Sequence, residues 1–156
     1  MSIEIPPFKI ANLLHELFGR TVDFDTSTPP DLSSPAPRWA AVYATPDGNI
    51  TAVCICDLSF AAFAGAALSM IPASTAKEGI KNQKLEPVIV DNLHEVFNIF
   101  GQLFRDRIMD TVTLREVGPV GELSARSQGL VAKPGKQVDL MFSIEGYGDG
   151  KLSLFS

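Results

Sequence analysis

The sequence predicts an α+β domain in which an antiparallel sheet packs against about three helices. Two apolar patterns predict this fold class. Some segments place apolar residues at helical spacing and others alternate apolar and polar residues as strands do, and turn signals separate the two kinds of segment along the chain. The composition agrees, because 46% of the residues are hydrophobic. The 156 residues suit one domain, 1–156, that buries roughly two-thirds of its unfolded surface.

The first part of the chain combines a helix, a short strand and a break. Apolar residues recur at helical spacing over 10–18 and predict a helix that stops at Gly19. Residues 22–24 alternate and predict a short strand. Residues 26–37 hold four prolines among serines and threonines, which predicts an extended loop without regular structure.

A hairpin and a buried helix follow. Residues 39–45 and 50–57 flank the sequence Pro-Asp-Gly-Asn, which is a strong hairpin signal. Small side chains on every face of residues 59–70 predict a helix in close contact with its neighbours. Either Asp57 or Ser59 can cap the start of this helix.

A longer helix and further strands complete the chain. The polar residues 72–86 are expected to be irregular, with room for one helical turn. Pro87 suits the first turn of a helix that runs to about Arg107. Beyond it, a strand ends at Gly118-Pro119, and the tail is predicted to be an antiparallel meander. The predicted strands are 111–117, 126–132, 138–144 and 151–155, with turns at 133–136 and 146–150.

Charge and hydropathy exclude several classes of protein. Acidic residues outnumber basic ones by 18 to 13, and the net charge of −5 disfavours non-specific binding to nucleic acid. No signal peptide is evident in residues 1–9, and the longest apolar stretch, 58–72, is too short to span a bilayer. We therefore expect a cytoplasmic protein with no nucleic-acid or membrane partner.

Cys54 and Cys56 are separated by one residue on a predicted strand. Their side chains would share a face, roughly 6.5–7 Å apart along the chain, which is poor geometry for a disulfide. A metal site would need a second pair of ligands, and the sequence shows none. We interpret both cysteines as small, buried, apolar side chains.

The predicted helix 87–107 carries the candidate site. On a wheel of about 100° per residue, its apolar side chains fall within an arc of about 140°. That arc holds Ile89, Val90, Leu93, Val96, Phe97, Phe100, Leu103 and Phe104. Opposite it stand Asp91, Glu95, Asn98 and Gln102, of which the first three lie at i, i+4 and i+7 and form one ridge. A solvated face would explain the charges, but an asparagine in an exposed helix interior costs roughly 0.5 kcal/mol relative to alanine.

The two histidines are weaker candidates. His94 flanks the polar face of this helix and could act as a base. A partly exposed helical histidine without a partner is more often inert than catalytic, and His15 on the first predicted helix has still less in its favour.

The ridge resembles the signature of the CheC/CheX/FliY phosphatases of chemotaxis, which is Asp or Ser, three residues, Glu, two residues, Asn and a later proline. Asp91, Glu95 and Asn98 keep this spacing, and 20 residues separate Asn98 from Pro119, slightly fewer than in the family. The order of predicted elements is also similar to that of the family from about residue 10 to residue 155. CheC-type members carry two such helices, whereas residues 59–70 contain no Glu and no Asn. The chain is therefore most similar to the single-site CheX type.

This resemblance implies a CheC-like fold, a homodimer joined through a continuous sheet, and a protein phosphatase. The substrate would be the aspartyl phosphate of a CheY-type response regulator. Asn98 would hold the attacking water, because an amide donates one hydrogen bond and accepts another, and Glu95 would pair with a lysine of the receiver. Asp91 and Gln102 would contribute to docking, and Pro119 would shape the adjacent loop. No metal or cofactor is expected on this chain, since Mg²⁺ is expected on the receiver.

Two other functions stay open. A non-catalytic adaptor of the same fold would use the same ridge to bind a receiver or a flagellar switch protein. An unrelated small-ligand binder would use the glycine-rich turn 146–150 and Tyr147. That glycine-rich run is not followed by a predicted helix, so a hairpin turn is favoured over a phosphate-binding loop.

Overall fold

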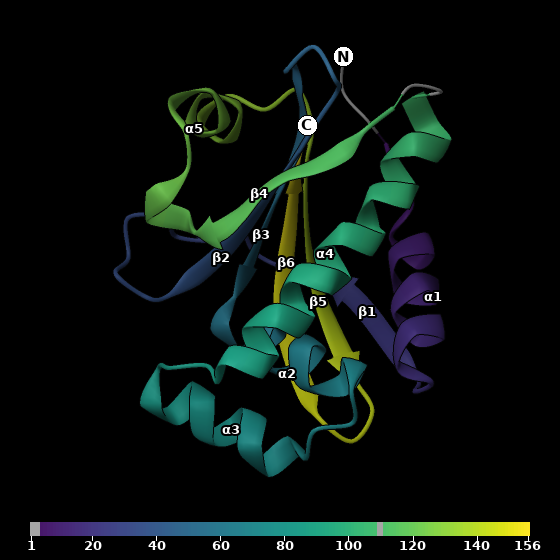
Figure 1. Cartoon of the computed structure of the whole chain (residues 1–156), viewed down its shortest axis with the longest axis vertical. Helices are drawn as coiled ribbons and strands as arrows, with labels where there is room; N and C mark the ends of the chain where they lie inside the picture. Colours follow the sequence, from purple (N-terminus) through teal and green to yellow (C-terminus); the bar gives the residue numbers. More distant parts are fainter. Residues whose placement is uncertain (1–3, 109–110) are drawn as a thin grey trace.

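The computed structural model describes residues 4–108 and 111–156, which form an α+β domain (Figure 1). The helices are α1 Pro7–Phe18, α2 Leu58–Leu68, α3 Ala73–Asn82, α4 Pro87–Ile108 and α5 Ala125–Ala132, with a 3₁₀ turn, η1, at Val120–Glu122. The strands are β1 Val22–Thr26, β2 Arg38–Ala44, β3 Ile50–Asp57, β4 Thr113–Pro119, β5 Gln137–Ile144 and β6 Gly148–Phe155. The predicted fold class is confirmed, although the described residues form five α-helices where about three were expected.

The strands form one antiparallel sheet in the order β1-β5-β6-β3-β2-β4. The predicted hairpin is confirmed, with Trp39 of β2 opposite Cys56 of β3. At its turn, the amide of Thr45 donates to the carbonyl of Asn49 at 3.0 Å. Strands β1 and β4 are the two edges of the sheet, and they lie on opposite sides of the domain.

The two faces of the sheet are covered differently. Helices α1, α2 and α4 pack on one face, and α3 packs against α2. Their contact with the sheet contains most of the apolar core, including Leu14, Tyr43, Phe60 and Phe142. Helix α5 covers only part of the other face, where a smaller cluster includes Val53 and other apolar side chains. No helix in the described part of the chain is long and apolar enough to cross a membrane.

Cys54 and Cys56 both point into the main core as free, buried thiols, as the alternation predicted. Burial raises the pKa of each thiol, so both stay protonated and unreactive. Across residues 4–108 and 111–156, no three His, Cys, Asp or Glu side chains gather as they would around a metal ion.

Residues 27–37 connect β1 to β2 without regular structure, as predicted (Figure 1, dark blue). Because β5, β6 and β3 lie between the strands that it joins, this segment must cross three strands. It does so over the face that the main helices leave open. Thr28 touches Lys151 there, and Lys151 alternates with Leu152 of the main core.

Three predictions about the second half were wrong. Residues 73–82 form α3, whose small buried residues Ala76 and Gly79 pack at helical spacing beneath a polar surface. Residues 125–132 form α5 instead of a strand, because the Ser124 side chain caps the helix by accepting from the Ser127 amide at 3.3 Å. Strand β4 continues through Gly118 to Pro119, since a proline at the end of an edge strand removes no ladder hydrogen bond.

Candidate functional site

Helix α4 places the predicted site residues on one exposed face. Its apolar arc is confirmed, with Val90 and Leu103 half-buried at its margins and the other six side chains buried. We define the α4 ridge as Asp91, Glu95, Asn98 and Gln102, all of which are exposed. At 1.5 Å per residue, the ridge extends about 16 Å along the helix.

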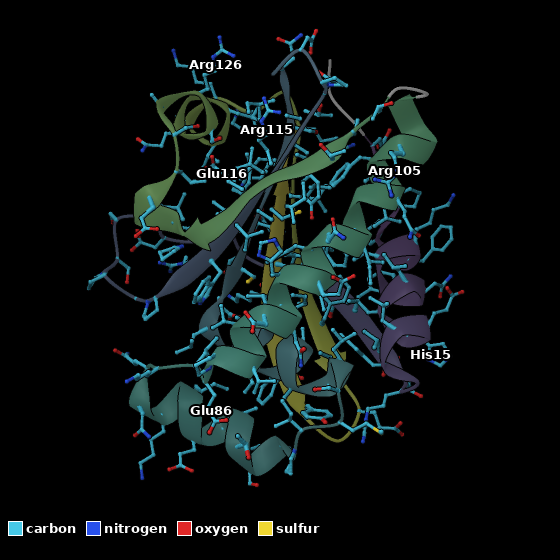
Figure 2. All side chains as sticks on the ribbon, in the orientation of Figure 1. His15, Glu86, Arg105, Arg115, Glu116 and Arg126 are labelled. Carbon is cyan, nitrogen blue, oxygen red and sulfur yellow. The ribbon has the colours of Figure 1, made fainter. Side chains whose placement is uncertain are left out.

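The polar groups of the ridge are not engaged within the described part of the domain. Asp91, Glu95, Asn98 and Gln102 make no side-chain hydrogen bond or ion pair with any described residue. Arg105, one turn beyond Gln102, differs because its guanidinium donates to the Val112 carbonyl at 3.0 Å. Figure 2 shows Arg105 on this end of α4, beside β4.

Asn92 holds the N-terminal half of α4 against α2. Its side-chain nitrogen donates to the Gly65 carbonyl at 2.8 Å and to the Ser69 hydroxyl at 2.7 Å. The helices approach very closely here, since a β-carbon on Gly65 would lie 2.5 Å from the Ile89 carbonyl oxygen. The close contact predicted for the small-residue helix is therefore confirmed. Sequence reasoning missed Asn92, because its polar side chain sits at the border between the two faces.

Tyr43 of β2 bonds to α4 from the sheet side, at the residue before Asn98. Its hydroxyl donates to the Phe97 carbonyl at 2.5 Å, and its ring packs on Phe104 with centroids 4.5 Å apart. Tyr43 is fully buried, and desolvation raises its pKa well above the usual value, so the phenol remains a donor. The backbone that precedes Asn98 is thereby bonded to the sheet, and the asparagine projects from a fixed support.

The histidines contribute no assembled catalytic group. His94 is exposed on α4 and has no hydrogen-bonding partner among the described residues. His15 lies on α1, where its Nδ1 is 2.7 Å from the Arg20 carbonyl oxygen (Figure 2). This contact ties the end of α1 to the following turn and leaves His15 away from the ridge.

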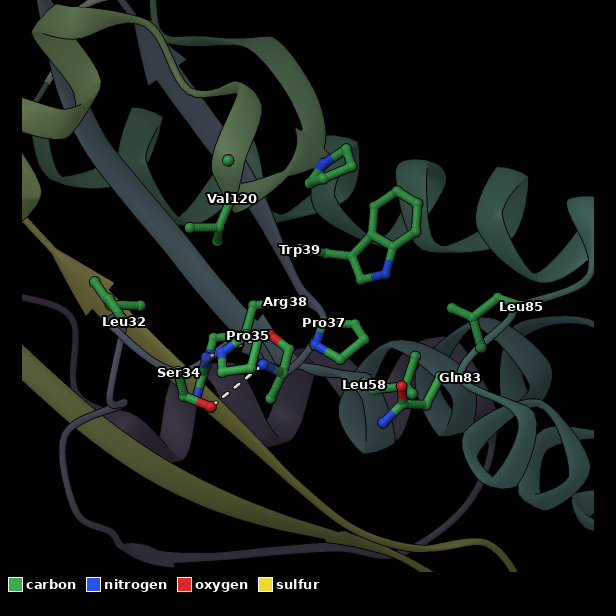
Figure 3. Close-up of a pocket in the computed structure, with 13 residues that line it drawn as sticks. Leu32, Ser34, Pro35, Pro37, Arg38, Trp39, Leu58, Gln83, Leu85 and Val120 are labelled. Atoms are coloured by element: carbon green, nitrogen blue, oxygen red, sulfur yellow. Dashed lines mark hydrogen bonds between the residues drawn. The ribbon is translucent and has the colours of Figure 1, made fainter.

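Pro119 was predicted to shape a loop beside the helix, and this prediction was wrong. Pro119 is the last residue of β4 and lies opposite Trp39 of β2. Both residues line a hollow of about 360 Å³, which we call the Trp39 hollow. Leu58 and Leu85 contribute to its apolar wall (Figure 3). Because Leu85 lies just before the start of α4, this hollow adjoins the N-terminal end of the site helix.

The glycine-rich run predicted as the turn 146–150 is shorter as a turn than expected, because Gly148–Gly150 already belong to β6, and the run packs against α2. The Tyr147 hydroxyl donates to the Ile71 carbonyl at 2.7 Å. A β-carbon on Gly150 would lie 2.4 Å from the Phe60 α-carbon, so glycine is needed there for close packing. Close packing on α2 therefore explains the glycine at position 150.

No family model and no curated protein matches the sequence, but its fold is shared with solved structures. The FliM middle domain from H. pylori has a TM-score of 0.63 at 13% identity, covering 95% of this chain and 83% of that chain. A chain of the CheX–CheY–BeF3–Mg²⁺ complex from Borrelia burgdorferi has a TM-score of 0.55 at 13% identity, covering 97% and 98%. FliY from Thermotoga maritima has a TM-score of 0.53 at 13% identity, covering 93% and 80%.

These likenesses show the class of fold alone, which is of the CheC/CheX/FliY type. The solved structures that share it include CheX, FliY and the FliM middle domain. The resemblance predicted from the spacing of the ridge residues is confirmed at the level of the fold.

Proposed function

We propose that this chain is a CheX-like phosphatase that hydrolyses the aspartyl phosphate of a CheY-type receiver. The observation that carries the proposal is the α4 ridge, where Glu95 and Asn98 lie one turn apart with unengaged side chains. The fold supports it, because one of the structures that share the fold is a CheX–CheY complex.

In the proposed reaction a water oxygen attacks phosphorus in line with the departing aspartyl oxygen. Such a reaction needs positioning and charge stabilisation more than covalent chemistry from the partner. The Asn98 amide would hold the water by accepting one hydrogen bond and donating another. The receiver would supply Mg²⁺ and the aspartate that leaves as a carboxylate, so this chain would need no cofactor.

Docking would depend on the remaining ridge residues. Glu95 would pair with a lysine beside the receiver's phosphorylation site and thereby orient α4. Asp91 and Gln102 mark the two ends of the ridge, about 16 Å apart, and would contact the rim of that site. The net charge of −5 favours a partner with a cationic surface.

A non-catalytic adaptor is the second candidate, because the FliM middle domain shares the fold with a TM-score of 0.63. The discriminating experiment follows the decay of a phosphorylated receiver with the wild type, Asn98→Ala and Glu95→Ala. Faster decay with the wild type and loss of that effect in both variants supports the phosphatase. Binding that persists in Asn98→Ala, with no acceleration by the wild type, supports the adaptor and contradicts the phosphatase.

The proposed protein is a homodimer, as the resemblance implies. The edges of β1 and β4 leave the sheet able to continue into a second copy. Sedimentation equilibrium would measure the mass in solution directly, and a monomer at micromolar concentration would contradict this part of the proposal.

A further inference from the structure

A second hollow lies beneath the crossover from β1 to β2, on the sheet face opposite α4. We call it the crossover hollow, and its volume is about 380 Å³. This volume falls within the range of about 300–1,000 Å³ that small-molecule sites occupy. Its roof is the segment 28–31, and its floor includes Ile55 and Ser153 of neighbouring strands.

The roof of this hollow is stiff. Pro29 and Pro30 fix their own φ angles and restrict the residues before them to extended conformations. The segment is anchored at one end, where the Ser27 amide donates to the Asp139 carbonyl at 2.9 Å. At its other end the Asp31 carboxylate accepts from the Ser33 amide at 3.1 Å and from the Ser33 hydroxyl at 2.6 Å. A rigid roof keeps the space beneath it open.

Two cations and two carboxylates line the crossover hollow. They are Arg38, Lys151, Asp31 and Asp57, and they come from four different parts of the chain. All four residues are described, yet no side-chain nitrogen of one lies within 4.0 Å of a carboxylate oxygen of another. Arg38, Lys151 and Asp57 are half-buried and Asp31 is exposed at the rim, so four charges line one small space without a direct ion pair.

The cations retain N–H groups that no acceptor among the described residues occupies, and Arg38 lines both this hollow and the Trp39 hollow. Lys151 donates to the Thr28 hydroxyl at 3.1 Å, which occupies one of the three N–H groups of its ammonium. Arg38 donates to the Ala36 carbonyl at 3.4 Å, which occupies one of the five N–H groups of its guanidinium. Both side chains are half-buried, so their remaining donors are only partly solvated.

The carboxylates offer the complementary charge. Asp57 is half-buried, and one of its oxygens accepts from the amides of Phe60 at 2.8 Å and Lys151 at 3.1 Å. Desolvation by burial raises its pKa despite these donors and the nearby cations. A positive group placed in the hollow would offset that desolvation of the carboxylate.

We propose that the crossover hollow binds a small zwitterion, an α-amino acid or a compound of that size with one carboxylate and one ammonium group. The ligand carboxylate lies against Arg38 and Lys151, and its ammonium lies against Asp57 and Asp31. The prolines of the roof and Ile55 of the floor contact its apolar part.

Other ligand classes fit the hollow less well. A simple anion would be repelled by two carboxylates, and a divalent cation would be repelled by Arg38 and Lys151. A nucleotide would need aromatic stacking surface or a surplus of positive charge, and neither lines this hollow. The charge arrangement selects a ligand that carries both signs.

The test uses the whole chain and a panel of free L-amino acids up to about 10 mM, which saturates a site of millimolar Kd. Thermal unfolding and amide chemical shifts of an isotope-labelled sample report binding. We expect at least one amino acid to raise the Tm by about 2–4 °C and to shift the amides of Thr28 and Ser153. The N-acetyl and carboxamide analogues of that amino acid, each lacking one charge, are expected to bind about tenfold more weakly.

Charge-removing variants locate the site. Arg38→Gln and Lys151→Gln are each expected to weaken binding about tenfold or more. Lys151→Gln keeps a donor for Thr28 and so preserves the roof. Lys136→Gln is the matched control, because Lys136 pairs with Glu4 outside the hollow. Three outcomes overturn the proposal: no amino acid binds, the N-acetyl analogue binds equally well, or binding survives both Arg38→Gln and Lys151→Gln.

Discussion

The Asn92 side chain donates a hydrogen bond of 2.8 Å to the Gly65 carbonyl, so a single residue of α4 links the orientation of this helix to the position of α2. Asn92 lies beside Asp91 and three residues before Glu95. Rotation of α4 about its axis would break this bond and would turn the ridge away from its present direction. The orientation of the candidate site is therefore set partly by a helix that carries none of its residues.

Asn92→Leu tests this relationship. The substitution keeps the number and branching of the side-chain heavy atoms but removes two hydrogen bonds, so we expect a loss of about 1–2 kcal/mol in the free energy of unfolding. If α4 acts as the proposed catalytic helix, decay of the phosphorylated receiver should slow roughly tenfold while receiver binding changes little. Val90→Ala, which trims a half-buried side chain of α4, is the control of comparable stability. An unchanged decay rate with Asn92→Leu would contradict the positioning role.

Gly65→Ala tests the close approach of the two helices. The added β-carbon would meet the Ile89 carbonyl oxygen at 2.5 Å, so α4 must shift and we expect a loss of about 1–3 kcal/mol. Gly129→Ala in α5 is the control, because its β-carbon would meet nothing within 4 Å and should add up to about 1 kcal/mol of helix stability. Urea unfolding of both variants measures the difference, and equal effects of the same sign would contradict the packing argument.

Tyr43→Phe tests the support beneath Asn98. It removes the hydrogen bond to the Phe97 carbonyl and should cost about 1 kcal/mol in the free energy of unfolding. Tyr147→Phe is a matched control, since its hydroxyl also donates to a backbone carbonyl, that of Ile71. Both variants should lose comparable stability, but only Tyr43→Phe should reduce the proposed phosphatase rate. Equal rates in the two variants would show that this bond does not position Asn98.

The sequence predicted the elements whose signal is local and missed those that depend on tertiary packing. The hairpin 39–57 and helix 87–107 carry strong periodicity or turn residues, and both are confirmed. Helix α3 was missed because its buried face consists of small residues beneath a polar surface. Helix α5 was mistaken for a strand because its short apolar run fits either pattern.

The candidate site shows the same division. The exposed ridge followed from helical geometry alone, and the structure confirms that its four residues share one exposed face. Asn92 and Tyr43 could not be found in this way, because their partners lie 27 and 54 residues away in the sequence. The crossover hollow depends on the order of strands in the sheet, which no local pattern determines.

Met70→Gly tests a strained helix terminus. Met70 follows α2 with a φ of 57°, a left-handed conformation that glycine adopts without penalty. Its side chain is 77% exposed, so the substitution removes little apolar burial. We expect Met70→Gly to raise the free energy of unfolding by about 1 kcal/mol, as measured by thermal unfolding. Gln83→Gly, at a φ of 54° after α3, should raise it by a similar amount. Destabilisation by both variants would show that these side chains make a contribution larger than the strain.

Asp57→Asn tests the charge at the start of α2. Burial raises the pKa of Asp57 above its ordinary value of 3.8, so the folded state binds the proton more readily than the unfolded chain does. At pH values above the folded pKa, the charged carboxylate therefore lowers the free energy of unfolding. This destabilisation disappears as the pH falls through the folded pKa towards 3.8. Asparagine keeps an oxygen that can accept from the Phe60 amide without carrying the charge. We expect Asp57→Asn to be at least as stable as the wild type at pH 7 and to lose this advantage as the pH is lowered towards 4. Urea unfolding between about pH 4 and 7 measures the difference, and an advantage that grows as the pH falls would contradict the raised pKa.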